Sequence, residues 1–467
     1  MNEIQKIALR LTAVFLAGGL LSFRPHNISV TENYQNVQSA FEAGDRIQQA
    51  EALLEIAALQ PWQRDLWETG GRLAHRSGSY DLAVEGLETS KELGVISDPG
   101  QLILADAYRE LGDQKSALEI WESLSGSAQA YREMAEIHDR SGEYQLAISD
   151  WESYLKSVGG GSQIDVYFRL CLLYSLQDPE QAVPYLNLAQ ASYPLAEKMN
   201  EIIEQVLEEE PAFQLVSVGQ VLAGGNEWVL AEEAFARAAD LRPDYPEAWA
   251  YWGESLQHIP NPEADPLETL QRAQELDNSS PLIQMFLGLY HQRRGSHLTA
   301  IDYFQQARKS WPDQPDVVLD LGRSTAATGD LDNALVYYQQ AVDLSGESTI
   351  YLSRLAAFCV EFSYRVQDIG LSAARQAVVQ SEDNPEALTA LGEVLLDLED
   401  DLNAVRMFSK AVDADPAYAP AHFQLSLLYS ESGNQEAAAY HLERIFETSQ
   451  NPVLLDRAER LKKTINQ

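Results

Sequence analysis

The chain has 467 residues, with 33 Lys and Arg against 71 Asp and Glu, which gives a formal net charge of −38. Hydrophobic residues make up 45% and charged residues 22% of the chain, a composition typical of folded proteins. The acidic excess argues against direct binding to nucleic acid or to an anionic membrane surface, because both need clustered Lys and Arg. Two cysteines are too few for a disulfide framework or for a structural zinc site of their own.

The first 26 residues differ in character from the rest. Lys6 and Arg10 outnumber Glu3, and an uncharged run of 13 residues, Leu11 to Phe23, follows them. A basic start and a short apolar run are typical of a secretory signal, although the run is shorter than the roughly 20 residues that cross a membrane. We predict an export signal or membrane anchor at residues 1–26, and hence an exported or membrane-anchored protein. The alternatives are a first helix packed on the remainder, or an unstructured tail, in a cytoplasmic protein.

The remainder of the chain repeats with a period of 34 residues where adjacent units meet without an insertion. The unit that begins at residue 281 shows the shared positions, which are the seventh, eighth, fifteenth, twentieth and twenty-fourth: Leu287, Gly288, Gly295, Ala300 and Phe304. Each unit divides into two amphipathic segments of about a dozen residues, too short to be stable helices alone. Such segments bury their apolar stripes by stacking on the next unit.

This register resembles that of the tetratricopeptide repeat family, whose 34-residue unit carries W-x2-L-G-x2-Y, then A-x3-F, then P. The same register recurs from about residue 30 to 452, in units that begin near residues 30, 64, 98, 128, 164, 212, 246, 281, 315, 349, 385 and 419. The resemblance implies an all-α fold: an α-solenoid of about twelve helix-turn-helix repeats wound into a right-handed superhelix.

Two interruptions divide the array. Gly159 to Ser162 predicts a flexible joint, and Glu197 to Glu210 predicts one extra amphipathic helix outside the period. Between the joint and the extra helix, Pro184 and Pro194 predict distorted helices. Further along the chain, Ser363 to Gly370 predicts a lengthened turn. After the N-terminal segment, we therefore predict a first block at residues 27–197 and a connector with the extra helix at residues 198–211. A second block follows at residues 212–452, and a C-terminal capping helix at residues 453–467.

The sequence offers little for catalysis. No segment outside the repeats is long enough for a catalytic domain, and the common phosphate-loop, dinucleotide, zinc-protease and serine-hydrolase motifs are absent. None of the eight histidines pairs at i, i+4, so we predict no metal site and no cofactor. Cys171 and Cys359 fall near packing positions and are expected to be buried. We predict that the protein is not an enzyme; an unrecognised active site in residues 159–211 is a weaker alternative.

In tetratricopeptide proteins the first helix of each unit lines a concave binding face, and the resemblance implies the same here. In the first block these helices carry Arg72, Arg76 and Arg109, which are candidates for contact with an acidic segment. The alternative, which we favour, is internal pairing of opposite charges four residues apart, at Glu68–Arg72, Arg132–Glu136 and Glu136–Arg140.

In the second block the corresponding positions form an apolar strip with a few polar anchors. The candidate partner-binding residues are Leu282, Met285, Leu289, Gln292, Arg293, Leu319, Arg323, Phe423 and Leu427. Apolar surface with Arg anchors is typical of protein recognition surfaces. The alternative is that some of these side chains pack against the neighbouring unit.

Together these features predict a non-catalytic protein-interaction scaffold that binds a protein segment on its concave face. Chaperone-binding members of the family pair Lys at the fifth position with Asn at the ninth, and none of the aligned units has that pair. We expect a neutral or basic protein partner, because a net charge of −38 repels acidic proteins at long range. Nucleic acid is not expected, and membrane contact is expected only through the N-terminus. The alternative function is a self-associating structural component of a cell-envelope assembly.

Overall fold

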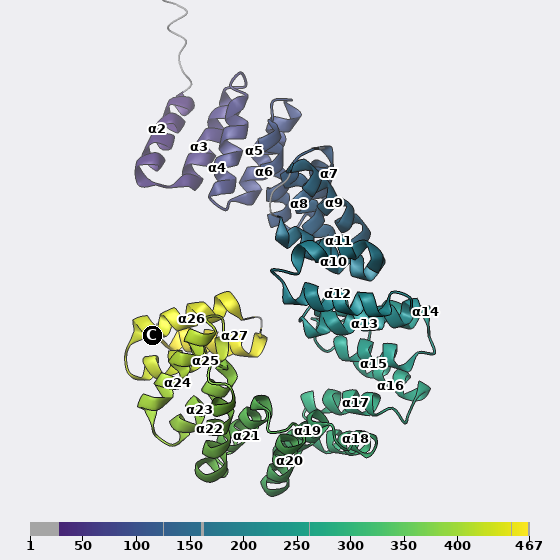
Figure 1. Cartoon of the computed structure of the whole chain (residues 1–467). Coiled ribbons are helices and arrows are strands. Elements are labelled where there is room, and N and C mark those ends of the chain that lie inside the picture. Colours follow the sequence, from purple (N-terminus) through teal and green to yellow (C-terminus); the bar gives the residue numbers. More distant parts are fainter. Residues whose placement is uncertain (1–27, 125, 160–162, 261, 450, 466–467) are drawn as a thin grey trace, which may run out of the picture. The chain divides into compact units, whose positions relative to one another are not determined.

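A computed structural model describes residues 28–124, 126–159, 163–260, 262–449 and 451–465 of the chain. Within these ranges the regular structure is α-helical apart from one π-helix, and no strand occurs. Twelve helical pairs follow one another, each at the place of one predicted unit (Figure 1). The predicted all-α solenoid is therefore confirmed. The chain divides into two compact units, Met1–Ile203 and Glu204–Gln467, which we call unit 1 and unit 2.

Unit 1 holds five of the pairs. They are α2 (Ile28–Ala43) with α3 (Arg46–Leu59), α4 (Asp65–Arg76) with α5 (Tyr80–Glu92), α6 (Asp98–Glu110) with α7 (Gln114–Ser123), α8 (Ala128–Arg140) with α9 (Tyr144–Ser157), and α10 (Ile164–Gln177) with α11 (Pro179–Ala189).

Helix α12 (Pro194–Val206) follows these pairs without a second helix of its own, and the boundary between the units falls within it. It lies earlier in the chain than the extra helix that the sequence predicts. Pro194 begins this helix, where a missing backbone N–H costs nothing, so the distortion predicted at Pro194 is wrong. Pro184 does lie inside a helix, α11.

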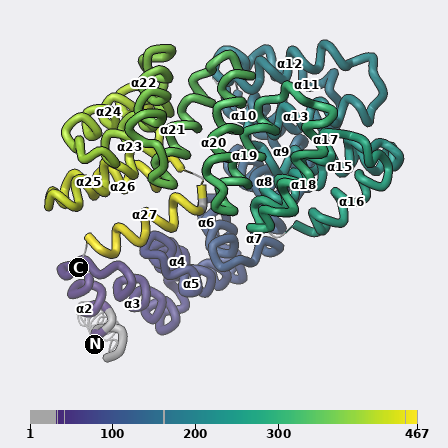
Figure 2. Tube along the Cα trace, turned by 90° about the horizontal axis from the view of Figure 1, so that it is seen from below, coloured from purple at the N-terminus to yellow at the C-terminus, as the bar shows by residue number. Residues whose placement is uncertain are grey.

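Unit 2 holds seven pairs and a last single helix. They are α13 (Pro211–Gly224) with α14 (Trp228–Leu241), α15 (Pro246–Ser255) with α16 (Pro266–Leu276), α17 (Pro281–Arg293) with α18 (His297–Ser310), α19 (Pro315–Ala327) with α20 (Leu331–Leu344), α21 (Thr349–Glu361) with α22 (Leu371–Gln380), α23 (Pro385–Asp397) with α24 (Asp401–Ala414), α25 (Ala419–Glu431) with α26 (Gln435–Thr448), and then α27 (Pro452–Ile465). Helix α27 packs against α25 and α26 (Figure 2).

A left-handed residue ends the first helix of many pairs, as the glycine at the fifteenth position predicts. Gly295 and Gly329 have φ of 73° and 90°, a conformation that costs glycine little. Glu399 takes the same position with φ of 62°, so this repeat holds a strained non-glycine residue there.

The glycine at the eighth position lets the two helices of a pair approach closely. A Cβ atom added to Gly288 would lie 2.5 Å from Cε1 of Phe304, and one added to Gly392 would lie equally close to Phe408. Both phenylalanines stand at the twenty-fourth position and are fully buried. The repeat register therefore reflects packing: an aromatic ring on the second helix lies directly against glycine backbone on the first.

The lengthened turn predicted after α21 contains the π-helix η1 (Val366–Gly370). Ser363 and Arg365, just before it, have positive φ of 48° and 56°. Gly370 then lies against Cys359, where a Cβ atom would come within 2.9 Å of the cysteine Cβ.

Both cysteines are buried and free, as the sequence predicts. Burial raises the pKa of the Cys171 and Cys359 thiols to about 12. Both therefore stay protonated at neutral pH and behave as small hydrophobic side chains.

The predicted signal or anchor at residues 1–26 lies outside the described residues. Among the described helices, none combines the length and the apolar character needed to span a membrane.

Candidate protein-binding surfaces

The first helices of successive repeats lie side by side along most of unit 2. Helices α13, α15 and α17 contact one another in turn, as do α21, α23 and α25. In Figure 1 these helices lie on the inner side of the unit, while α14, α18, α20 and α24 lie on its outer side. We call the surface formed by the first helices of a unit its inner surface. It is the place where the sequence predicts partner binding.

On the inner surface of unit 1, most of the charged residues are paired with one another. Arg72 contacts Glu68 at 3.3 Å within α4, and the ring of His75 on that helix lies 2.5 Å from Asp106 on α6. Arg109 forms ion pairs with Asp106 and Glu110 on its own helix and with Glu133 on α8.

The same pattern continues to the next repeat, where Arg169 on α10 makes two bonds of 2.5 and 2.6 Å to Asp139 on α8. Of the three arginines predicted to bind a partner in this block, Arg72 and Arg109 therefore contact acidic residues of the chain itself. Arg76 is exposed and forms no ion pair with another described residue. The predicted pairs Arg132–Glu136 and Arg140–Glu136 are also present, at 3.1 and 3.8 Å.

The apolar strip predicted in unit 2 is divided between surface and core. Leu282, Met285 and Leu289 on α17 are half-buried, and so is Leu427 on α25. Leu319 and Phe423 are 9% and 5% exposed and belong to the core. The position in the repeat does not distinguish the half-buried side chains from the core ones. The burial of a large side chain at the fifth position depends on how closely the next repeat packs against it.

The polar residues of the strip connect neighbouring repeats. Nε2 of Gln292 donates to the backbone oxygen of Asp320 at 2.9 Å and to Oγ of Ser324 at 2.8 Å. Arg293 makes two hydrogen bonds to the Glu254 carboxylate, at 2.7 and 3.0 Å, although α15 and α17 belong to different repeats. Two of the predicted anchors, Gln292 and Arg293, therefore form hydrogen bonds with residues of neighbouring repeats.

Arg323, the remaining anchor, is half-exposed and lies 3.4 Å from the carboxylate of Asp320. Burial raises the pKa of Asp320 to about 6, with the nearby Arg323 opposing the shift. The carboxyl of Asp320 is therefore close to taking up a proton at neutral pH, and the Arg323 guanidinium remains open to solvent.

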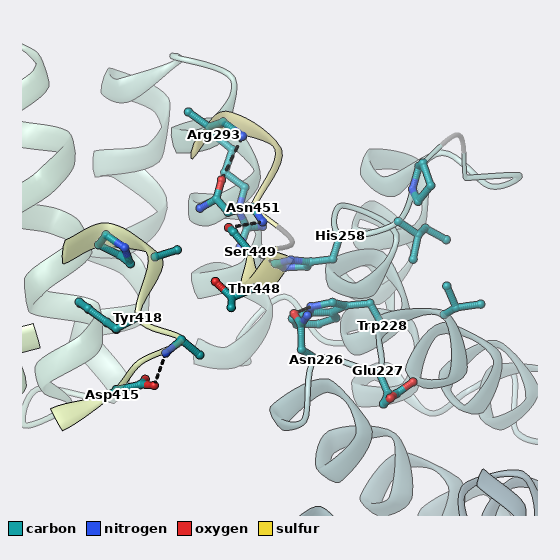
Figure 3. Close-up of a pocket in the computed structure, with 17 residues that line it drawn as sticks. Asn226, Glu227, Trp228, His258, Arg293, Asp415, Tyr418, Thr448, Ser449 and Asn451 are labelled. Carbon is teal, nitrogen blue, oxygen red and sulfur yellow. Dashed lines mark hydrogen bonds between the residues drawn. The ribbon is translucent and has the colours of Figure 1, made fainter. Parts of the chain in front are cut away.

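The structure also shows a cleft in unit 2 that sequence reasoning missed (Figure 3). It has a volume of about 1010 Å³ and is lined mainly by the turn before α14, the turn after α15 and the loops that precede α25 and α27. On one wall the Trp228 and His258 rings stack with centroids 3.7 Å apart, and Trp228 donates to Asn226 at 2.7 Å. Tyr418 and Asn451 line the other wall. No motif marks this cleft, because its residues come from turns far apart in the chain.

A second cleft lies on the inner surface of the last repeats and has a volume of about 630 Å³. Helices α21, α23, α25 and α27 supply its walls. Its apolar floor consists of Ala357, Val360 and Leu396, and acidic side chains stand around that floor. We call it the acidic groove.

The described residues contain no group of three or more His, Cys, Asp and Glu side chains that could hold a metal ion. The one close histidine pair, His422 and His441, lies in a packed position with Nδ1 atoms 2.8 Å apart.

The fold and these surfaces define a class of helical-repeat solenoid proteins. Within it, residues 287–348 and 385–418 match the tetratricopeptide repeat family. The tetratricopeptide register predicted from the sequence is therefore confirmed in these residues, and a solenoid of such repeats is consistent with a protein-interaction scaffold.

Among curated proteins, the human antiviral innate immune response effector IFIT1 is 22% identical over 229 residues, which cover 48% of this chain and 45% of the relative. The chain thus spans about half the length of that relative. Among solved structures, the APC/C heterotetramer Cut9–Hcn1 matches with 14% identity, 96% of this chain, 98% of that chain and a TM-score of 0.43. Yeast Tom70 matches with 14% identity, 93% and 96% coverage and a TM-score of 0.45. MamA from Desulfovibrio magneticus RS-1 matches with 20% identity, 36% and 94% coverage and a TM-score of 0.29.

Proposed function

We propose that this protein is a non-catalytic scaffold that binds a segment of a partner protein along the inner surface of unit 2. The observation that supports this most is the row of half-buried apolar side chains on α17, namely Leu282, Met285 and Leu289. These side chains already pack on one side against the hydrophobic core and keep part of their surface in solvent. Covering the remaining apolar area would stabilise a complex by roughly 25 cal/mol per Å² before the costs of association.

Capture of the partner from the protein's own cells tests this proposal. We expect the double variant Met285→Glu with Leu289→Glu to lose capture, because two carboxylates on the strip must be desolvated on binding. The matched control is Leu298→Glu with Val336→Glu, on the second helices α18 and α20, where the side chains are 73% and 47% exposed. The two variants carry the same added charge. Equal capture by the strip variant and the native protein, with helicity intact, would place the binding surface elsewhere.

The proposed partner is neutral or basic overall, because of the net charge of −38. We further propose that residues 1–26 export the protein or hold it at a membrane. Cell fractionation of the full chain and of a chain that lacks these residues tests this point. Recovery of both forms in the same soluble fraction would contradict it.

Self-association is the second candidate, and large exposed apolar side chains on second helices favour it. Leu298, Val379 and Leu402 are 73%, 78% and 88% exposed. In this role the array would form part of a cell-envelope assembly through its outer side or its ends. Light scattering separates the two functions, since only a self-associating chain shows a mass that rises with concentration, and Leu298→Glu with Leu402→Glu should then lower that mass.

A further inference from the structure

The acidic groove on the last repeats differs from the rest of the inner surface in how its charges are satisfied. Glu361 and Asp397 are exposed at the ends of α21 and α23, and neither forms an ion pair with another described residue. Glu393 lies deeper and accepts a hydrogen bond of 2.7 Å from the neutral side chain of Gln424. On the inner surface of unit 1, by contrast, Asp106, Glu133 and Asp139 each contact an arginine. Two of the three carboxylates in the groove, those of Glu361 and Asp397, therefore lack the arginine contacts that such groups have in unit 1.

One cation of the chain does reach this groove, and it shows what kind of group fits there. Arg457 on α27 lines the groove, and its guanidinium carbon lies 4.5 Å from the centre of the Phe423 ring. Burial raises the pKa of Glu393, and Gln424 and Arg457 oppose that shift. A guanidinium stacked on an aromatic ring beside a carboxylate is a favourable arrangement in a partly dry site. A single arginine nevertheless leaves the groove with three carboxylates against one positive charge.

The floor of the groove adds an apolar component to this charge. Val360 and Leu396 are half-buried between the acidic positions, on α21 and α23. A ligand that covers this floor and reaches the carboxylates must present apolar groups and positive charges on one face. Lys and Arg side chains also bring long aliphatic stems, which can cover apolar surface while their heads contact the carboxylates.

We propose that the acidic groove binds a segment of the partner protein in which Lys or Arg residues alternate with apolar ones. The Arg and Lys heads lie between Glu361, Glu393 and Asp397, and the apolar residues cover Val360 and Leu396. This inference rests on the proposed scaffold function and names the chemistry of the segment that the scaffold recognises. It also assigns the recognition of charge to the last repeats, separate from the apolar strip on α17.

Fluorescence anisotropy with the full-length protein tests the groove directly. The probe is a labelled synthetic peptide that alternates Arg and Leu, used at about 0.15 M salt, where long-range attraction to the acidic chain is largely screened. We expect Glu361→Gln with Asp397→Asn to weaken its binding about tenfold, which corresponds to about 1.4 kcal/mol. Both positions are exposed, so the fold is not at risk.

The control removes the same charge elsewhere, with Glu382→Gln and Asp383→Asn in the exposed loop after α22. The proposal is supported if the control changes the affinity for the peptide by less than about twofold, against the tenfold change (about 1.4 kcal/mol) expected for the groove variant. Equal losses in the two variants would show attraction to net charge alone and would overturn it. Absence of binding to the native protein, or equal binding of a Glu–Leu peptide, would overturn it as well.

The same measurement separates this inference from the scaffold function. If the strip variant Met285→Glu with Leu289→Glu loses the cellular partner while the Arg–Leu peptide does not bind, the scaffold function stands and the basic segment is wrong. If the groove variant lowers a concentration-dependent mass in light scattering, the occupant is a second copy of this chain and the proposal is again wrong.

Discussion

The two units use the same repeat and differ in what their inner surfaces do with charge. In unit 1, Arg109 and Arg169 bridge from one first helix to the next through Glu133 and Asp139. In the last repeats of unit 2, Glu361 and Asp397 have no such contacts among the described residues. First-helix arginines thus bridge repeats in unit 1, whereas the last repeats of unit 2 combine one such bridge, Arg354–Glu386 at 3.1 Å, with two carboxylates that have no ion pair among the described residues. Charge on a concave surface does not by itself indicate a binding site.

Within unit 2, the ion pair that joins α15 to α17 gives the largest expected effect. The Glu254 side chain is only 11% exposed and accepts two hydrogen bonds from Arg293. Arg293→Met should therefore lower the free energy of unfolding of unit 2 by about 3 kcal/mol, because the carboxylate stays buried without its main partner. Urea unfolding followed by circular dichroism measures the change. Lys309→Met, at an exposed site without an ion pair, is the matched control, and an equal loss there would contradict this explanation.

A smaller loss is expected when the bridge in unit 1 is broken. The Arg109 side chain is 26% exposed and lies among Asp106, Glu110 and Glu133, so Arg109→Met leaves three acidic groups close together. Because these groups are partly hydrated, we expect a cost of about 1–2 kcal/mol in unit 1. Arg76→Met on α4 removes the same charge from an exposed side chain and should cost almost nothing. Equal unfolding curves for the two variants would mean that the pairing in unit 1 contributes no stability.

The smallest of these effects concerns pH and the last repeat. Burial and, to a smaller extent, the neighbouring His422 lower the pKa of His441 to about 4. The pKa of His422 is also lowered, mainly by burial, and its Nε2 lies 3.1 Å from the backbone oxygen of Pro416. An unfolded histidine titrates near pH 6.5, so between pH 6.5 and 4 the unfolded chain binds more protons than the folded one. The contribution of this histidine pair to the free energy of unfolding is therefore complete above pH 6.5 and decreases as the pH falls toward 4.

The variant His441→Gln isolates that contribution, since an amide can also donate to Nδ1 of His422 without titrating. Between pH 7 and pH 5 we expect the native protein to lose about 1 kcal/mol more than the variant, after allowing for partial hydration of the ring. Buried carboxyls such as Asp320 titrate in both proteins and cancel in the difference. Parallel pH profiles would show that the pair does not contribute to stability in this range.

The repeat register and the identity of the core were accessible from the sequence for a definite reason. Gly288, Ala300 and Phe304 recur because two short helices can pack closely only when bare backbone faces a ring. The same reasoning could not separate Met285, which keeps surface in solvent, from Leu319, which is buried. Both stand at the fifth position, and their burial depends on the side chains of the next repeat. Ion pairs between repeats, such as Arg293 with Glu254, likewise cannot be predicted from a local sequence pattern.

The sequence by itself determined the all-α class, the number of helical pairs and the residues that fill each pair, since these follow from local periodicity and from contacts within one unit. The tertiary structure alone decided which charges are paired, which apolar residues of the strip remain exposed, and where clefts form. Those properties depend on the distance and rotation between neighbouring repeats. Small side-chain differences at each junction set that geometry, and no single repeat contains the information.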